Sequence, residues 1–177
     1  LEVARELPAD AVVVTLLPDG GRGYLGKIFS DEWMSSYGFS AAGDGQVVGD
    51  LVHRKGGSLP ELVHVTPRST VRDAIAVLRR YDVSQVLVLA AEPPVVMGEV
   101  VGSLGERALL DFVGSGRAAM TDPVGGLPLE MLPLIGLGEP VAAARTALGT
   151  ADALLVTDGG KPHAVLTRSD LLSHLSQ

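Results

Sequence analysis

The sequence predicts an α/β (α+β) fold in which one β-α-β-β-α unit occurs twice. From residue 62 onward, short apolar and β-branched runs alternate with segments whose apolar residues recur at helical spacing. The same order of elements then returns in the second half of the chain. The apolar helix positions of the first copy recur at one constant offset, so that Val71, Ala74 and Leu78 correspond to Val141, Ala144 and Leu148.

The first copy is expected to contain three strands and two helices. The strands are predicted at residues 62–65, 86–89 and 99–102. Ser69 or Thr70 is expected to cap a helix whose inner face carries residues 71, 74, 75 and 78. The second helix is expected to hold Leu109 and Leu110, and Ser103 and Glu106 are expected to form a capping box at its start.

The second copy repeats this order with shorter loops. Its strands are predicted at residues 132–135, 153–156 and 164–166. Leu171 and Leu172 in its closing helix correspond to Leu109 and Leu110, at a smaller offset than the one that relates the preceding helices. One further short helix is expected over residues 47–52, ahead of the first copy.

A separate segment precedes the two copies. Residues 1–7 are typical of the end of a helix, and residues 11–17 of a strand buried on both faces of a sheet. Three glycines between residues 20 and 23 permit a tight turn at the end of that strand. Because a lone strand is unstable, we expect its neighbours to lie upstream of Leu1, in a larger protein.

Composition excludes several classes of function. The chain has 177 residues, a net charge of −7, no cysteine and only 4% aromatic residues. With no basic cluster and few rings, nothing favours binding to nucleic acid or to an anionic membrane. No apolar run approaches the roughly 18 residues that a membrane span needs. We therefore expect a cytoplasmic location, where cysteine-poor chains are common.

The first segment carries a family resemblance. Leu17-Pro18-Asp19-Gly20-Gly21-Arg22-Gly23-Tyr24-Leu25, then Lys27-Ile28-Phe29, resembles the last strand and tail of the fold-type II β-replacement enzymes that use pyridoxal phosphate. The continuation Asp31-x-Trp33-Met34 resembles the cystathionine β-synthases rather than the shorter cysteine synthases. This resemblance covers residues 1–40 and departs from the family at Gly23 and Gly26.

The doubled unit carries a second resemblance, to a tandem pair of CBS domains. The implied organisation is a catalytic-domain tail (1–40), a linker (41–46), a first CBS domain (47–115) and a second one (116–177). In that family a nucleoside lies in a cleft between the two copies, with its ribose on the aspartate of a G-h-h-T-x-x-D ending. Paired CBS domains also commonly associate through their helices.

Thr167 and Asp170 match that ending in the second copy, although Ala164 replaces the glycine. Two roles are open for this pair, and they do not exclude each other. In one, the pair caps the closing helix locally, with Asp170 reaching back to the N-cap residue. In the other, the carboxylate accepts both hydroxyls of a ribose. In the first copy Gly105 and Ala108 stand at these positions, so only one adenosyl site is expected.

Other residues complete the expected adenosyl site. The resemblance places apolar and amide side chains of both copies beside Thr167 and Asp170: Val165, Val83, Gln85, Val86, Leu62 and Val63. Arg168, Lys161 and His163 are expected near the cleft mouth, either to meet phosphates or to form a solvated rim. The four histidines lack metal-ligand spacing, so no metal site is expected.

Three hypotheses about function follow. In the first, the chain is the regulatory region of a cystathionine β-synthase, a lyase of cysteine biosynthesis, and binds S-adenosylmethionine as an allosteric ligand. The pyridoxal phosphate and its lysine would lie upstream, and this fragment alone would not be an enzyme. The alternative is a stand-alone AMP- or ATP-sensing protein without catalytic activity. The third is a dimerisation module with empty clefts. A homodimer is expected through apolar helix residues that remain spare: Val77, Leu110, Phe112 and Leu175.

Overall fold

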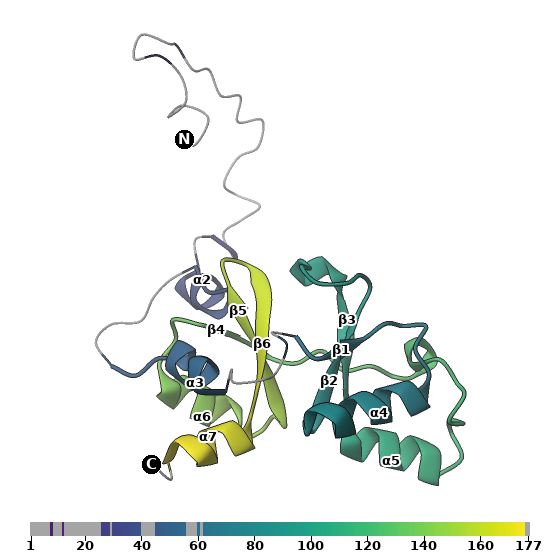
Figure 1. Cartoon of the computed structure of the whole chain (residues 1–177). Coiled ribbons are helices and arrows are strands. Elements are labelled where there is room, and N and C mark those ends of the chain that lie inside the picture. Colours follow the sequence, from purple (N-terminus) through teal and green to yellow (C-terminus); the bar gives the residue numbers. More distant parts are fainter. Residues whose placement is uncertain are drawn as a thin grey trace.

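A computed structural model describes residues 8, 12, 26–28, 30–39, 45–55, 60 and 62–175. Two β-α-β-β-α repeats make up residues 62–175, each built on a three-stranded mixed sheet (Figure 1). In each sheet the first strand runs parallel to the second, and the second runs antiparallel to the third. The predicted doubled unit is therefore confirmed.

The first repeat follows the predicted order closely. Its elements are β1 (His64–Val65), α4 (Val71–Tyr81), β2 (Gln85–Leu89), a 3-10 turn η2 (Met97–Glu99), β3 (Val100–Gly105) and α5 (Glu106–Gly114). The predicted inner face of α4 is confirmed, because Val71, Ala74 and Leu78 are buried in the core of this repeat. Thr70 is the N-cap residue, as one of the two predicted candidates.

The second repeat is more compact, as its shorter spacing predicts. Its elements are a preceding 3-10 turn η3 (Val124–Gly126), β4 (Leu134–Gly136), α6 (Val141–Ala147), β5 (Ala153–Asp158), β6 (Lys161–Thr167) and α7 (Arg168–Leu175). Only residues 159 and 160 join β5 to β6, whereas residues 90–99 join β2 to β3. The two glycines in that tight turn both have positive φ.

Helix α3 (Val48–Lys55) confirms the short helix expected ahead of the first copy, but it packs on the second repeat. Val48 and Leu51 are buried in the same core as Ile135 and Leu148. The N–H of Val48 also donates to the carbonyl of Glu139 at 2.8 Å. The packing therefore groups α3 with α6 and α7, which Figure 1 shows beside the second sheet.

The two sheets share a third apolar cluster. It contains Leu62, Leu87 and Leu89 of the first repeat together with Leu155 of the second. Burial of this cluster joins the repeats into one body, because apolar side chains from both are removed from water by the same contact. The helices α4 and α5 lie on one side of this junction, and α3, α6 and α7 lie on the other (Figure 1).

The segment ahead of the repeats is described only in part. Its one described helix is α2 (Asp31–Ser36). The expected helix over 1–7, the strand over 11–17 apart from Val12, and the glycine turn after it lie outside the described residues. No helix in the described part of the chain combines the length and apolar character of a membrane span.

The capping box expected at Ser103 and Glu106 is wrong. The strand β3 runs three residues further than predicted, so Ser103 lies inside it and is only 6% exposed. Its hydroxyl donates to the carbonyl of Glu130 at 2.9 Å. The helix α5 instead begins after Gly105, which has no side chain to cap it.

Candidate functional site

A cleft of about 320 Å³ lies where the two repeats meet. The strands β2 and β5 begin at this cleft, and the helices α5 and α7 begin there as well. Its lining comes from both repeats: Ser84, Gln85, Glu106 and Arg107 from the first, and Asp152, Thr167, Arg168 and Ser169 from the second. This volume is at the lower end of the range of small-molecule sites, about 300–1,000 Å³.

Thr167 and Asp170 form a local cap at the start of α7. One carboxylate oxygen of Asp170 accepts from the Thr167 N–H at 2.7 Å and from the Thr167 hydroxyl at 2.8 Å. Thr167 lines the cleft, and Asp170 lies one helical turn behind it. The structure therefore shows one half of the predicted capping box, in which Asp170 reaches back to Thr167. The other half, from the Asp170 N–H to the Thr167 hydroxyl, stays a prediction.

The same T-x-x-D spacing occurs at Thr70 and Asp73, where α4 begins. The carboxylate of Asp73 accepts from the Thr70 N–H at 2.8 Å and from its hydroxyl at 2.7 Å, and the Asp73 N–H donates back at 3.2 Å. The hydrogen bonds from the Thr70 backbone and hydroxyl hold the pKa of Asp73 below its ordinary value. This capping box lies outside the cleft, so the spacing alone does not imply a ligand.

The starts of the two closing helices are equivalent but differ in chemistry. Gly105 pairs with Gln85 across β3 and β2, just as Thr167 pairs with Ala153 across β6 and β5. The predicted correspondence of Gly105 with Thr167 is therefore confirmed. The N–H of Glu106 donates to the carbonyl of Ser84 at 3.1 Å, but no side chain of the described residues caps α5. Its next N–H groups are therefore available to a ligand in the cleft.

Gln85 explains why the first repeat has no threonine at this point. Its side-chain amide lies against Gly105, in space that a Cβ on Gly105 would fill. In the first repeat the larger residue of the pair, Gln85, is on the second strand, and Gly105 is on the third. In the second repeat the larger residue, Thr167, is on the third strand, and Ala153 is on the second. Gln85 and Thr167 consequently reach the same cleft from opposite repeats, as expected from the sequence.

Among the cleft residues that the sequence reasoning missed, Arg107 bears most directly on a ligand; the others are Ser84, Glu106, Asp152 and Ser169. It lies in the first turn of α5 and has no ion-pair or hydrogen-bond partner among the described residues. The signal was its position in the alignment of the two repeats, where Arg107 corresponds to Ser169. An arginine there brings a charge that is permanent at physiological pH and geometrically suited to phosphate.

Arg168 lines the cleft but is held by its own repeat. Its guanidinium donates to the carbonyls of Leu148 at 2.8 Å and Ala151 at 3.0 Å, and it lies 3.4 Å from the carboxylate of Asp152. The expectation that Arg168 is ready to meet phosphates is therefore weakened. Part of its guanidinium is already committed to these contacts, so a phosphate would have to share it with Leu148, Ala151 and Asp152.

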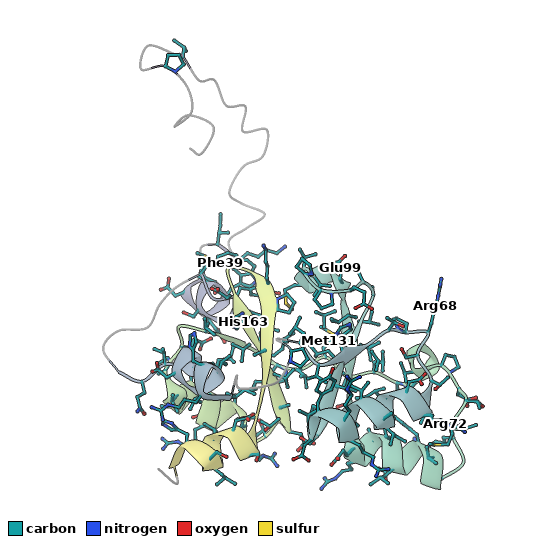
Figure 2. All side chains as sticks on the ribbon, viewed as in Figure 1. Phe39, Arg68, Arg72, Glu99, Met131 and His163 are labelled. Atoms are coloured by element: carbon teal, nitrogen blue, oxygen red, sulfur yellow. The ribbon has the colours of Figure 1, made fainter. Side chains whose placement is uncertain are left out.

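Lys161 and His163 do not lie at the mouth of this cleft. Lys161 begins β6 at the tight turn, whereas Thr167 ends it, and six residue steps of a strand span roughly 20 Å. Figure 2 shows His163 on β6, well away from the start of α7. The expectation for these two residues is wrong, because it did not take account of the direction of the strand.

The apolar residues of the expected site line the core rather than the cleft surface. Val86 is fully buried in the core of the first repeat, and Val63 and Val83 pack against that core. Leu62 and Val165 belong to the cluster between the sheets. They support the strands that carry Gln85 and Thr167, and a direct contact of these five side chains with an adenine stays a prediction.

Neither a metal nor pyridoxal phosphate finds a fitting set of residues in the described part of the chain. No group of three or more His, Asp and Glu side chains is placed there to hold a metal ion. The described Lys27 and Lys161 are exposed and do not line the cleft. The residues present do not fit a Schiff-base site, which needs a lysine beside a phosphate-binding cup.

Solved structures share this architecture. A putative signal-transduction protein with CBS domains from Burkholderia ambifaria aligns with a TM-score of 0.63 and 18% identity, over 73% of this chain and 93% of that one. A CBS-domain protein from Agrobacterium tumefaciens aligns with a TM-score of 0.60 and 20% identity, over 73% and 99%. The chain has the fold of a CBS-domain pair.

A third CBS-domain structure contains a ligand. CBSX2 in complex with AMP aligns with a TM-score of 0.57 and 24% identity, over 75% of this chain and 98% of that one. No protein-family model matches the chain. At these identities the likeness shows the CBS-pair fold, and the ligand of this chain has to be argued from its own cleft.

Proposed function

We propose that this chain is a regulatory module that binds one adenosine nucleotide, AMP or ATP, in the cleft between its CBS repeats. The observation that carries the proposal is the start of α5. An uncapped helix start lies on the cleft surface together with Arg107, which is unpaired among the described residues, and both attract an anion. A phosphate is the anion that an adenosine nucleotide would supply.

The second half of the proposed site is the start of α7. Asp170 accepts the ribose hydroxyls, and Thr167 holds its carboxylate in place through the two hydrogen bonds of the cap. The ribose would then lie on the second repeat and the phosphate on the first. The CBSX2 structure with AMP supports an adenosine nucleotide as the class of ligand.

The arrangement also supports a single site per chain. The equivalent of Asp170 in the first repeat is Ala108, which offers no acceptor to a ribose. The equivalent of α5 in the second repeat is α7, where Ser169 stands at the position of Arg107 and offers no positive charge to a phosphate. The start of α5 thus offers a site for the phosphate, and the start of α7 offers an acceptor for the ribose hydroxyls.

A second candidate is the S-adenosylmethionine-responsive region of a cystathionine β-synthase. The observation that favours it is α2, whose residues 31–34 carry the resemblance to that enzyme family and which is packed on the second repeat. In that case pyridoxal phosphate and the catalytic lysine belong to a longer protein. The cleft favours the first candidate, because Arg107 would face a ligand that carries a positive sulfonium.

Calorimetric titration of the 177-residue chain with AMP, ATP and S-adenosylmethionine tests both candidates. We expect one AMP per chain and weaker binding of S-adenosylmethionine. Tighter binding of S-adenosylmethionine would favour the second candidate. Two nucleotides per chain would contradict the single site, and heats equal to buffer dilution for all three ligands would leave the dimerisation module as the better hypothesis.

A further inference from the structure

Residues 30–39 form a short docked segment, which we call the strap. Ser30 caps α2 by accepting from the N–H of Trp33 at 3.3 Å, and Asp31 and Glu32 place negative charge in its first turn. The ring of Trp33 stacks on Tyr37 with centroids 4.4 Å apart. None of the α2 side chains is fully buried, so a helix of six residues depends on outside contacts for its stability.

Those contacts are made by the second repeat. The hydroxyl of Thr157, a fully buried residue of β5, donates to the carbonyl of Ser36 at 2.6 Å. The N–H of Gly160 in the tight turn donates to the carbonyl of Tyr37 at 2.8 Å. Figure 2 shows Phe39 of the strap beside that end of the second sheet. The strap therefore offers carbonyl acceptors to a hydroxyl and an N–H at this end of the second sheet.

Two glycines allow the backbones to approach this closely. A Cβ on Gly136 of β4 would collide with the carbonyl oxygen of Ser35. Gly38 has φ +73° and a Cβ on it would collide with the carbonyl oxygen of Thr157. Both sides of the contact are thus fitted to each other, because an ordinary residue at either position would push the backbones apart.

Only the second repeat is built for this contact. Thr157 corresponds to Leu89 in the first repeat, because Ala153 corresponds to Gln85, and Leu89 has no hydroxyl to offer. By the same strand registers Gly136 corresponds to Thr66, which carries a side chain. The strap surface is therefore a specific feature of the repeat that also carries Thr167 and Asp170.

The strap and the cleft lie at opposite ends of one hairpin, formed by β5 and β6. Ala153 pairs with Thr167 at the cleft, whereas Asp158 pairs with Lys161 next to the strap. Residues 153–157 of β5 between these ends are all fully buried. A shift at either end must be carried along the strand, since a close-packed strand does not deform locally at little cost.

We propose that the strap is coupled to the cleft through β5 and β6, so that the surface around Gly136 and Thr157 relays ligand binding to the chain ahead of residue 30. The relay of a nucleotide signal rests on the proposed function, whereas the mechanical coupling does not. By linkage, a docked strap and a filled cleft favour each other to the same extent. The strap is then the output of the regulatory module.

The experiment compares Gly136→Ala with Gly126→Ala in the full 177-residue chain. A Cβ at Gly126 meets nothing within 4 Å, so this control introduces the same methyl group without a collision. Trp33 is the only tryptophan, and its emission and its quenching by acrylamide report whether the strap is docked. Hydrogen exchange of the amides of residues 165–170 reports the cleft end without any ligand.

We expect Gly136→Ala to expose Trp33 to acrylamide and to speed exchange at residues 165–170 by about fivefold or more, the lower end of allosteric coupling. AMP affinity should fall by a similar factor, and AMP should protect Trp33 in the parent chain. Gly126→Ala should resemble the parent in every measurement. Faster exchange confined to residues 30–39 and 157–160 would overturn the coupling.

The ligand-free readout separates this inference from the proposed function. If the parent chain binds no AMP, the proposed function fails, and exchange at residues 165–170 still decides whether strap and cleft are coupled. If Gly136→Ala does not fold, Thr157→Val removes only the hydroxyl that binds Ser36 and keeps the shape of the buried side chain. An exposed Trp33 with unchanged exchange at the cleft in that variant would equally overturn the coupling.

Discussion

At the scale of the residue, the proposed function makes the charges of the cleft decide which adenosyl ligand would bind more tightly. Arg107 and Glu106 are neighbours in the first turn of α5, both are exposed, and both line the cleft. Arg168 and Asp152 largely neutralise each other at 3.4 Å. The balance between Arg107 and Glu106 therefore sets the sign of the potential that a ligand meets.

Arg107→Gln should weaken AMP binding by about tenfold, since a charge-assisted hydrogen bond contributes roughly 1.5 kcal/mol or more. Glu106→Gln should strengthen AMP binding by a smaller factor, because it removes a negative charge near the phosphate. Calorimetric titration checks both variants. S-adenosylmethionine, which carries a positive sulfonium, should respond in the opposite direction. Equal AMP affinity for the parent and both variants would contradict a phosphate at α5.

Asp170 needs a test that separates its two roles. Asp170→Ala removes the cap and the proposed ribose acceptor together, so AMP affinity should fall by roughly 2–4 kcal/mol, about thirty- to several-hundred-fold. The same change should cost about 1 kcal/mol of folding stability. Asp170→Asn keeps a local acceptor for the cap and loses the charge that two hydroxyl donors favour.

A thermal unfolding curve for each titrated variant separates the capping role of Asp170 from its proposed role as a ribose acceptor. We expect Asp170→Asn to keep most of the melting temperature of the parent and to lose most of the AMP affinity. If it binds AMP as tightly as the parent, Asp170 serves only the cap, as Asp73 does in α4.

Sequence reasoning at this scale proposed Thr167, Asp170 and Gln85 as site residues, of which Thr167 and Gln85 line the cleft, but it did not propose Arg107. The first two follow a recognisable spacing, and Gln85 stands at a predictable strand start. Arg107 looked like one more exposed charge on a helix. Its relevance depends on α5 being uncapped, and that depends on β3 continuing through Ser103 to Gly105. The length of that strand was set by tertiary pairing with β2, which no local pattern in the sequence reveals.

At the scale of the element, the elements that were predicted well are those with a clear period or a buried apolar run. The helix α4 shows both an apolar face and a capping residue, and β5 is an unbroken apolar run. The strand β1 was predicted twice as long as it is, because only His64 and Val65 pair with β2, and Leu62 packs in the cluster between the sheets. The docking of α3 on the second repeat had no local signal, since Val48 and its partner Glu139 are far apart in the sequence.

The capping box of α4 gives a pH-dependent contribution to stability. Hydrogen bonds from the Thr70 backbone and hydroxyl lower the pKa of Asp73 in the folded chain below its ordinary value of 3.8. Because the folded pKa is depressed, this contribution is fully present above pH 3.8 and is lost as the pH falls through the folded pKa. The free energy of unfolding should therefore decrease over that acidic range.

The control for this prediction is Asp73→Asn, measured by urea denaturation between neutral pH and the acidic range. The asparagine variant should be less stable than the parent at neutral pH, and the difference between the two should shrink as the pH falls. A difference that stays constant with pH would show that the titration of Asp73 is not linked to folding.

At the scale of the whole molecule, the outer helices leave an apolar face uncovered. Leu110 of α5 is 73% exposed and Leu172 of α7 is 67% exposed. These two leucines have the same separation along the chain as Gly105 and Thr167, so they are equivalent in the two repeats. Figure 1 shows α5 and α7 along one edge of the molecule. The two repeats therefore each contribute one exposed leucine, from α5 and from α7, which lie along the same edge of the molecule.

A groove between α4 and α5 adjoins this face. It has a volume of about 320 Å³ and is lined mainly by apolar side chains, among them Ile75, Leu109, Leu110 and Val113. Of the residues expected from the sequence to be spare, Phe112 is not available, because it is only 8% exposed in the core of the first repeat. Val77 packs against the same core, and the side chain of Leu175 lies outside the described residues.

We predict that the chain is a homodimer joined through α5 and α7. Burying each leucine contributes roughly 1.5–3 kcal/mol, and a two-fold axis would bury four of them in one interface. The double variant Leu110→Glu/Leu172→Glu places charges there and should be a folded monomer, since neither side chain supports the core. Val96→Glu, at a residue 52% exposed in the loop between β2 and β3, should remain a dimer. Sedimentation equilibrium at tens of micromolar protein distinguishes these outcomes, and a monomeric parent chain would show that this apolar face serves another purpose.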